Sequence, residues 1–268
     1  MPVYFCPIAS GSNGNSTYVG CGDAHILFDA GLSGKSIQSG LRLIKADPAK
    51  IDAIFITHEH SDHIQSAGVL SRRFDIPIYA TAGTWAAMEC DRSFGFVSDK
   101  NKRVICYDTR YDIRGITVKP FEIPHDASEP AGYNVFAENL KISILTDIGQ
   151  ATDAVKDSLY HSDIMLVESN HDVEMLKKGP YPWPLKKRIL SEKGHLSNAG
   201  CGVLLSEIMS ERIKYVYLAH LSEENNRPYL AMDTVTGILE SNGIYPGRDF
   251  NLAIANRGFI SDCITLGG

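Results

Sequence analysis

The stretch IDAIFITHEHSDH, residues 51–63, decides the fold of this chain. Its first part, Ile51–Ile56, is an apolar, β-branched run of strand length that stops at Thr57. Four side chains with metal-binding atoms follow within six positions: His58, His60, Asp62 and His63. Imidazole nitrogens and carboxylate oxygens are ligands for borderline divalent metals. A loop at a strand end aims alternate residues at one point, so we expect His58 and His60 to share one ion, with Asp62 and His63 beside a second. A His-rich surface turn is the alternative.

Length and composition limit the class of protein. The 268 residues suffice for one large or two small domains, and 44% hydrophobic with 22% charged residues is ordinary for a globular protein. No signal peptide opens the chain and no apolar run approaches the roughly 18–20 residues of a membrane span, so we expect a cytoplasmic protein with no membrane partner. The net charge of −6 means that nucleic-acid binding would require a local basic patch.

Cysteine usage points to a reducing compartment. The six cysteines are scattered, with no CxxC pair, and we expect reduced, mostly buried thiols rather than a disulfide framework. They are Cys6, Cys21, Cys90, Cys106, Cys201 and Cys263.

Periodicity and turn residues predict alternating strands and helices. Predicted strands lie at Val3–Ile8, Tyr18–Gly20, His25–Phe28, Ile76–Ala80, Gly115–Glu122, Leu140–Leu145, His161–Glu168 and Tyr215–Ala219. Predicted helices cover Ser36–Ala46, Ile64–Phe74, Thr81–Glu89 and Ala199–Ser210, whereas Asp91–Tyr107 is irregular. No repeat or linker interrupts the pattern, so we expect a single domain over residues 1–268.

Several polar residues stand directly after these strands. Asp29 stands in FDAG, at a strand terminus before a Gly turn, His125 stands in IPHD, and Asp147 stands in TDIG after a strand. Farther along come Glu168 at a strand end, His195 in GHLSN before a helix, and His220 in LAHLS after a strand. Taken singly, Asp29 is also explained as a turn residue, Asp147 as a helix-capping residue and His125 as a structural loop residue; the order of all six residues is the signal.

This ordered set carries a family resemblance. HxHxDH after an apolar strand resembles the signature of metallo-β-lactamase-fold hydrolases, which implies an α/β fold: a four-layer αββα sandwich with a di-metal site at one edge of its sheets. The series SGSNGNST, THEHSDH, HDA, TDIG, ESNHD, GHLSN and AHLSEENN resembles the WalJ/YycJ-type family, described as metal-dependent exonucleases acting on double-stranded DNA. Residues 148–194 are too few for the inserted β-CASP domain of RNA-degrading relatives.

The resemblance implies a role for each residue. Metal one would be held by His58, His60 and His125, metal two by Asp62, His63 and His220, with Asp147 bridging and Asp29 orienting the ligand loop. Zinc and manganese both suit two such sites. A metal-bound hydroxide would attack phosphorus. Asp62 and the pair His195–Glu168 are the catalytic candidates, the imidazole giving a hydrogen bond or a proton to the phosphate. A packed, non-catalytic His195 is the alternative.

Substrate contacts are expected around the metal edge and on one basic stretch. The small-residue loop Ala9–Thr17 offers Ser12, Asn13 and Asn15 for a phosphate oxygen, and a plain turn explains it equally well. Asn170, His171 and Asp172, and Ser222, Asn225 and Asn226, would flank the metals or cap their loops. Lys177–Arg188 (KKGPYPWPLKKR), with its prolines, predicts an extended, exposed loop in which Lys186, Lys187 and Arg188 bind phosphates while Tyr181 and Trp183 stack on bases. The alternative is a solvated loop with Trp183 in the core.

We therefore expect a di-metal phosphodiesterase, an exonuclease on duplex DNA. The alternatives are an RNA-processing nuclease, a small-molecule ester, lactone or thioester hydrolase on the same fold, and a non-catalytic metal-binding scaffold. The last of these usually lacks ligands, and here none is missing.

Overall fold

The signature stretch begins as the short strand β4 (Ala53–Phe55) in the computed structural model. It pairs in parallel with β3 (Ala24–Phe28) on one side and β5 (Ile78–Thr81) on the other. Central, parallel position explains why its residues are apolar throughout, since both faces of such a strand are covered. The predicted strand Ile51–Ile56 is therefore present, with a shorter hydrogen-bonded core.

The structure describes residues 1–267, which divide into two units. Unit 1 comprises Met1–Glu122, Ala127–Asn139 and the chain from Asn256 onward; unit 2 comprises Ile123–Asp126 and Leu140–Ala255. Each unit is assembled from separated segments, so neither is a stretch of chain set apart by one linker. A single domain over 1–268 stays a prediction. Among residues 1–267, none of the helices is both long and apolar enough to cross a membrane.

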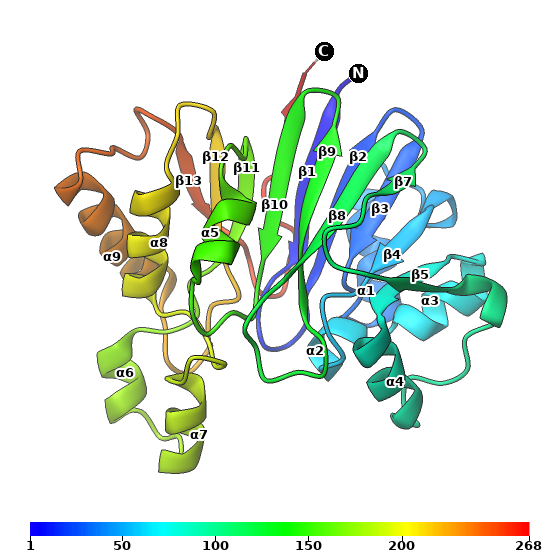
Figure 1. The fold of residues 1–268 in the computed structure, drawn as a ribbon, viewed down its shortest axis with the longest axis horizontal. Coiled ribbons are helices and arrows are strands. Elements are labelled where there is room, and N and C mark those ends of the chain that lie inside the picture. The colour runs from blue at the N-terminus through cyan, green and yellow to red at the C-terminus, as the bar shows by residue number, and fades with distance from the viewer. Residues whose placement is uncertain (268) are drawn as a thin grey trace. The chain divides into compact units, whose positions relative to one another are not determined.

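Unit 1 contains a seven-stranded sheet in the order β14-β1-β2-β3-β4-β5-β6 (Figure 1). Its remaining strands are β1 (Val3–Ala9), β2 (Ser16–Cys21), β6 (Lys102–Ile105) and β14 (Ile264–Leu266). Strands β7 (Tyr111–Ile113), β8 (Ile116–Glu122) and β9 (Ala131–Ala137) pair antiparallel in the same unit. The helices are α1 (Gly34–Leu43), α2 (Ser61–Ile64), α3 (Ala67–Phe74) and α4 (Ala82–Cys90), with 3₁₀ turns at Pro48–Lys50 and Asp99–Asn101.

The core of unit 1 joins α1 to this sheet. Ile37 and Leu41 of α1 are fully buried in one cluster with Leu27 and Ile54 of the central strands. Ten residues are too few for a stable isolated helix. Burying one such side chain contributes about 1.5–3 kcal/mol, so packing rather than propensity holds α1 in place.

Unit 2 is built on four parallel strands: β10 (Leu140–Leu145), β11 (Ile164–Glu168), β12 (Tyr215–Ala219) and β13 (Asn251–Ile254). Its helices are α5 (Asp153–Leu159), α6 (Val173–Lys178), α7 (Trp183–Ile189), α8 (Asn198–Ile208) and α9 (Pro228–Ser241). Figure 1 shows α8 and α9 side by side near β12 and β13. The carboxyl ends of parallel strands meet at one edge of a sheet, which is where ligand-binding residues gather. The predicted α/β class is confirmed.

Two predicted segments are wrong in detail. The helix over Ile64–Phe74 begins earlier, at Ser61, and breaks at Ser66, whose backbone N–H donates to the Ala30 carbonyl at 2.9 Å. The stretch Asp91–Tyr107, expected to be irregular, contains the edge strand β6. Charged residues on that strand hide the alternating pattern from which strands are predicted.

The exposed loop predicted over Lys177–Arg188 is also wrong. Most of that stretch lies in α6 and α7. The prolines do not prevent this, because Pro182 is the N-cap residue of α7 and Pro184 lies in its first turn, where no intrahelical N–H bond is lost. Trp183 is 57% exposed, so its alternative placement in the core is wrong as well.

The cysteine prediction fails for one pair. Cys6 and Cys263 form a disulfide with a Cα–Cα distance of 4.5 Å. The pair is brought together by the antiparallel register of β1 and β14, in which Phe5 lies opposite Ile264. The two cysteines are 257 positions apart in the sequence, and spacing carries no signal at that range. The other four are free thiols, buried at Cys21 and Cys201 and exposed at Cys90 and Cys106.

Candidate metal centre

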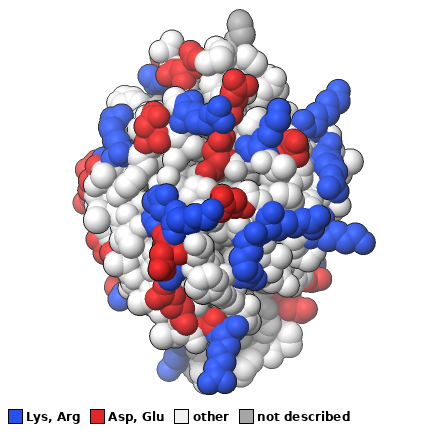
Figure 2. All heavy atoms as spheres, turned by 90° about the vertical axis from the view of Figure 1, so that its right-hand side faces the viewer, with Lys and Arg blue, Asp and Glu red and all other residues white. Residues whose placement is uncertain are grey.

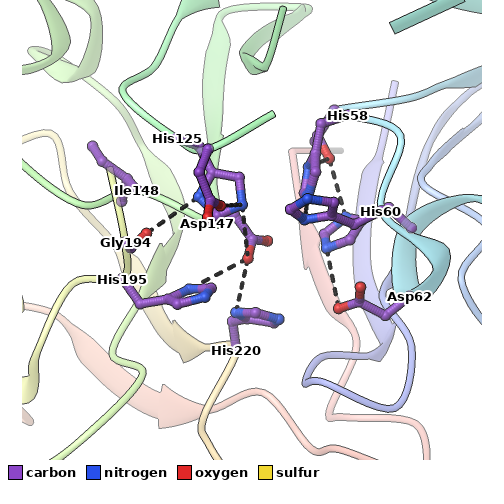
Figure 3. Close-up of polar contacts among 12 residues, drawn as sticks. His58, His60, Asp62, His125, Asp147, Ile148, Gly194, His195 and His220 are labelled. Atoms are coloured by element: carbon purple, nitrogen blue, oxygen red, sulfur yellow. Dashed lines mark hydrogen bonds and ion pairs between the residues drawn. The ribbon is translucent and has the colours of Figure 1, made fainter. Parts of the chain in front are cut away.

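In unit 1 the signature residues leave β4 and turn into α2. His58 and His60 lie in the loop, whereas Asp62 and His63 lie in the single turn of α2. The His58 Nε2 and His60 Nδ1 atoms are 2.9 Å apart, and the rings of His58 and His63 are separated by 4.1 Å between centroids. His63 Nε2 is 3.4 Å from Asp62 Oδ2. Figure 3 shows His58, His60 and Asp62.

Asp29, directly after β3, contacts this loop through both carboxylate oxygens. Its Oδ2 lies 2.7 Å from His63 Nδ1, and its Oδ1 accepts from the Thr57 backbone N–H at 2.8 Å. The Thr57 hydroxyl donates to Asp29 and also lies 3.0 Å from His58 Nδ1. Because Asp29 occupies the Nδ1 side of His63, the Nε2 atom faces Asp62. A carboxylate behind an imidazole in this way fixes the ring and raises its basicity as a metal ligand.

Asn15 and Gly31 hold α2 against the rest of unit 1. The Asn15 side chain lies 3.0 Å from His63 Nε2 and 3.3 Å from Asp62 Oδ2, and its backbone N–H donates to the Asp62 carbonyl. A side chain at Gly31 would overlap the carbonyl of Asp62, so only glycine permits this approach. Asn15 is 4% exposed, and its polar groups are directed at the signature residues. Ser12 and Asn13, in the same loop, are exposed.

In unit 2 a buried carboxylate gathers the second group. Glu168, at the end of β11, places Oε1 2.8 Å from His195 Nδ1 and 2.9 Å from His220 Nδ1. Its Oε2 accepts from the backbone N–H groups of Ile148 and Leu196. Asp147 Oδ1 lies 3.4 Å from His195 Nδ1 and 3.3 Å from His220 Nδ1.

His125 completes the unit 2 group. Its Nδ1 lies 3.2 Å from the Gly194 carbonyl, and its Nε2 lies 3.9 Å from Asp147 Oδ1. Figure 3 shows His125, Asp147, His195 and His220 gathered together. The expected neighbourhood of Glu168 with His195 is thus found within unit 2, and His220 shares the same carboxylate oxygen.

Three of these residues adopt a left-handed backbone just beyond a strand. The φ angles are 60° at Asp29 after β3, 57° at Asp147 after β10 and 54° at His220 after β12. Such angles are uncommon outside glycine and cluster at functional sites, where the surrounding structure compensates for the strain. Each bends the chain sharply as it leaves its strand.

The histidines of unit 2 differ in the direction in which their pKa values are shifted. Burial lowers the pKa of His195, but the carboxylates of Glu168 and Asp147 outweigh burial, and the pKa lies above its ordinary value. For His125 burial prevails over Asp147, and the pKa is lowered. Burial would raise the pKa of Glu168, yet the charge and hydrogen bonds of His195 and His220 bring it down to about 2. Glu168 is therefore an anion near neutral pH.

These donor sets fit divalent cations. Asp147, Glu168, His195 and His220 offer ligand atoms that all lie within 4.8 Å of one another. In unit 1, two imidazole nitrogens converge to 2.9 Å, and a carboxylate lies beside a third imidazole. Mixed nitrogen and oxygen donors of this kind suit zinc and manganese.

The expected substrate contacts around the unit 2 group are mostly buried. Asn170 Nδ2 donates to the His220 carbonyl at 2.9 Å, and the Ser222 hydroxyl accepts from the Asn225 N–H at 3.1 Å. All three residues are at most 6% exposed. Their bonds are of the loop-capping kind that was the alternative to substrate binding.

The three basic candidates of α7 differ from one another. Lys186 is 8% exposed, and its Nζ donates at 2.7 Å to the carbonyls of Lys177 and Gly179, at the end of α6. Its predicted phosphate contact conflicts with this burial. Arg188 forms a two-bond ion pair with Asp126. Lys187 is exposed, with Nζ 6.0 Å from the centre of the Trp183 ring.

Sequence reasoning missed several contacts of the site. It did not identify the Thr57 hydroxyl, the Gly194 carbonyl or the bond between His220 and Glu168. Thr57 directly precedes the first signature histidine, and that position was the available signal. The His125–Gly194 and His220–Glu168 contacts join residues at least 52 positions apart in the sequence, and no local sequence pattern predicts such contacts.

Comparison with known proteins gives a family match. A family model described as "Beta-lactamase superfamily domain" matches residues 24–221. The chain is 38% identical to exodeoxyribonuclease YycJ of Bacillus anthracis, over 94% of this chain and 95% of that protein. It is 40% identical to exodeoxyribonuclease WalJ of Streptococcus pneumoniae, over 91% of each.

Solved structures share the fold at low sequence identity. The metallo-β-lactamase fold protein YhfI from Bacillus subtilis has a TM-score of 0.72 and 16% identity, covering 97% of this chain and 99% of that one. The short form of human tRNase Z has a TM-score of 0.62 and 19% identity, covering 98% and 99%. At this identity the likeness concerns the fold alone.

Proposed function

Because this chain belongs to the metallo-β-lactamase superfamily and, within it, to the family of the YycJ and WalJ exodeoxyribonucleases, we propose that it is a metal-dependent exonuclease acting on double-stranded DNA. The family makes it a hydrolase and accounts for the metallo-β-lactamase fold. The proposal that the substrate is DNA rests on the sequence identity of 38–40% to exodeoxyribonucleases, which extends over 91–95% of both chains.

The proposal includes two divalent ions, zinc or manganese. His58, His60 and His125 would hold one ion, Asp62, His63 and His220 the other, and Asp147 both. Their imidazole and carboxylate donors support this assignment. When bound, such ions neutralise charge on phosphate oxygens and make a nucleophile available at neutral pH.

The remaining work falls to the protein's own side chains. Asp29 and Thr57 fix the rings of His63 and His58 through the bonds described above. Glu168 holds Nδ1 of His195, which leaves Nε2 to face a phosphate. Because its pKa is raised, His195 carries a proton over a wider pH range, and we assign it to donate a hydrogen bond or that proton to the leaving oxygen.

The proposed DNA surface is the basic face of α6 and α7, formed by Lys177, Lys178, Trp183 and Lys187. All four are exposed. The last turn of α7 is tied to the candidate metal centre within unit 2, because the Ile189 carbonyl accepts from the His195 N–H at 2.9 Å and Arg188 pairs with the neighbour of His125. An exposed indole offers a face on which a terminal base stacks.

Other lysines are engaged by acidic residues. Figure 2 shows basic and acidic side chains interspersed over one face. In unit 1, Lys100 pairs with Asp75, Lys102 with Glu89, and Lys119 with Asp108, each at 2.7 Å. Lys177 and Lys178 share the single carboxylate of Glu174, whereas no acidic partner is seen for Lys187 among the described residues.

The surface makes a quantitative prediction. Replacing Lys177, Lys178 and Lys187 with Ala should weaken duplex DNA binding and reduce the salt slope by up to about 0.9 for each phosphate group that the variant no longer neutralises. Replacing Lys100, Lys102 and Lys119 with Ala is the matched control, because it removes the same charge. Fluorescence anisotropy over a range of salt concentrations measures both. Equal effects of the two triple substitutions would exclude the α6–α7 face.

The function itself is tested with end-labelled duplex DNA and RNA, incubated with manganese or zinc. We expect the label to be released progressively from DNA, and Asp147→Ala to abolish release. Elemental analysis of the purified protein should find two ions per chain. Hydrolysis of lactones or thioesters with intact DNA, or an active Asp147→Ala protein, would overturn the proposal.

A further inference from the structure

A second feature of unit 2 lies beside the proposed catalytic pair. A cavity of about 440 Å³ runs along α8, between that helix, α5 and the loop after Asp147. We call it the α8 cavity. Its volume lies in the range of small-molecule sites. Its lining includes Gln150, Lys156, His171, His195, Val203 and Leu204.

His171 is the unusual residue of this lining. It is 1% exposed, and neither ring nitrogen has a hydrogen-bond partner among the residues that the structure describes. Buried polar atoms are nearly always paired, so an unpaired pair of ring nitrogens that lines a cavity calls for a partner such as a water molecule, an ion or a ligand. The backbone on both sides is fixed, since the His171 carbonyl accepts from Asn198 N–H at 2.9 Å and the residue bridges to Ser197. Both nitrogens are therefore held ready for a ligand.

The rest of the lining does not suit a simple anion. Within the part of the chain that the structure describes, Lys156 is the only Lys or Arg of the lining, and its Nζ lies 2.7 Å from Glu207, which also lines the cavity. Much of the wall is apolar, with Leu196, Val203 and Leu204. Apolar walls with a few polar groups match a flat ring that carries donors and acceptors on its edge. A nucleobase has this chemistry.

The α8 cavity shares a residue with the candidate metal centre. His195 lines the cavity, and the same imidazole is held by Glu168. A ligand in the cavity therefore touches the group that we assign to the leaving oxygen. Residues 149–151, which line the cavity too, directly follow Asp147 and Ile148.

From this juxtaposition we propose that the α8 cavity binds the terminal nucleoside of the strand being cleaved, with His171 hydrogen-bonded to its base or sugar. The inference rests on the proposed function for the identity of the strand. It adds a specific pocket for one nucleoside next to the scissile phosphate, which limits each cut to the end of the chain.

The test measures binding apart from catalysis. Deoxyadenosine and dAMP are titrated into the full-length protein by calorimetry, with inorganic phosphate as a competitor. Val203→Trp fills the cavity from an exposed helix position and should weaken binding of both by about tenfold or more. Val69→Trp on α3 is the matched control, because Val69 is 48% exposed and Val203 is 47% exposed. Equal binding to both variants, or full displacement of deoxyadenosine by phosphate, overturns the proposal.

A second variant addresses His171 directly. His171→Phe keeps the ring and removes both nitrogens, so it should weaken deoxyadenosine binding while circular dichroism stays unchanged; unweakened binding counts against the assignment. Hydrolysis of bis(p-nitrophenyl) phosphate by the wild-type protein reports on the proposed function separately. If the wild-type protein binds deoxyadenosine in the cavity but does not hydrolyse bis(p-nitrophenyl) phosphate, the proposed nuclease is refuted and the pocket is not. If it hydrolyses bis(p-nitrophenyl) phosphate but does not bind deoxyadenosine, only the pocket is refuted.

Discussion

At the residue scale, the most informative group is the Glu168 carboxylate, because one oxygen serves two imidazoles. Glu168 Oε1 lies 2.8 Å from Nδ1 of His195 and 2.9 Å from Nδ1 of His220. We assign His195 to the cleavage reaction and His220 to metal binding. Changes at Glu168 and at His195 should therefore differ in kind. Removing the shared carboxylate disturbs both functions, whereas removing one imidazole disturbs one.

We predict that His195→Ala lowers phosphodiester cleavage by about 10²–10⁴-fold and leaves the metal content intact. Glu168→Gln should lower cleavage and also weaken metal affinity by about 10–100-fold, because His220 loses its charged partner. Metal titration against a chromophoric chelator separates the two variants. Loss of an ion from His195→Ala would make His195 a ligand and reassign His220.

His171 gives a pH dependence that does not involve metals. Burial brings its pKa from 6.5 down to about 4, although the Glu168 carboxylate acts in the opposite direction. The unfolded chain therefore binds the proton more tightly, and stability falls as pH decreases from about 6.5 towards 4. The loss amounts to about 3 kcal/mol over that window.

We predict that His171→Phe removes this component, so the stability difference between wild type and variant shrinks or reverses as the pH falls. Urea unfolding in the presence of EDTA at a series of pH values measures it. Parallel curves for the two proteins would show that His171 does not remain neutral in the folded state.

The residue scale is also where sequence reasoning succeeded best. His58, His60, Asp62 and His63 stand in one short motif, and a motif is local information. The left-handed turns at Asp29, Asp147 and His220 explain why functional residues appeared at strand ends, although the angles themselves were not predictable. The burial of Asn15, Asn170 and Asn225 was not predictable either, since amides of this kind usually suggest exposed loops.

At the element scale, helices α6 and α7 show that two adjacent lysines can have different roles, one structural and one proposed to bind DNA. Lys186 and Lys187 are neighbours, but a helix turns about 100° per residue, so they face opposite environments. Lys186 satisfies the terminal carbonyls of α6, and Lys187 lies beside an exposed indole. A charge pattern alone does not distinguish them.

We predict that Lys186→Ala destabilises the fold by about 1–3 kcal/mol, since it leaves two partly buried carbonyls without their donor. Lys187→Ala, the matched control, should change the free energy of unfolding by less than about 0.5 kcal/mol. Chemical denaturation compares the two. A stable Lys186→Ala protein would make Lys186 a candidate for phosphate binding again.

Strands with mostly buried, apolar residues were predicted more accurately than strands at the edge of a sheet. Leu140–Leu145 and Tyr215–Ala219 appear with the predicted bounds, because each is rich in buried apolar residues and ends where a polar residue follows within two positions. Edge strands β6 and β14 escaped prediction, since β6 carries two charged residues and β14 is only three residues long. Strand β9 and helix α9 were missed as well, because no functional motif drew attention to them.

At the scale of the whole molecule, the Cys6–Cys263 disulfide links strand β1 to the residue directly before strand β14. Both strands belong to unit 1. A link between such distant positions restricts the unfolded chain strongly and typically adds about 2–4 kcal/mol to stability. The sequence did not predict this disulfide, because all six cysteines were expected to be reduced thiols.

We predict that the protein, denatured without reductant, exposes four thiols per chain to Ellman's reagent, and six after reduction. Cys6→Ser should lower the urea midpoint, whereas Cys90→Ser, at an exposed free thiol, should not. Six reactive thiols before reduction would mean that Cys6 and Cys263 lie close together without a bond.

The pairing of β14 with β1 also has a consequence for synthesis. One side of β1 (Val3–Ala9) acquires its hydrogen-bonding neighbour only when Ile264–Leu266 has been made. At about 5–20 residues per second, the ribosome leaves that edge uncovered for roughly 13–50 seconds. An uncovered strand edge is a template for pairing with other chains. Nascent chains of this protein thus pass through a period in which β1 is exposed to aggregation, and that period ends once β14 pairs with β1.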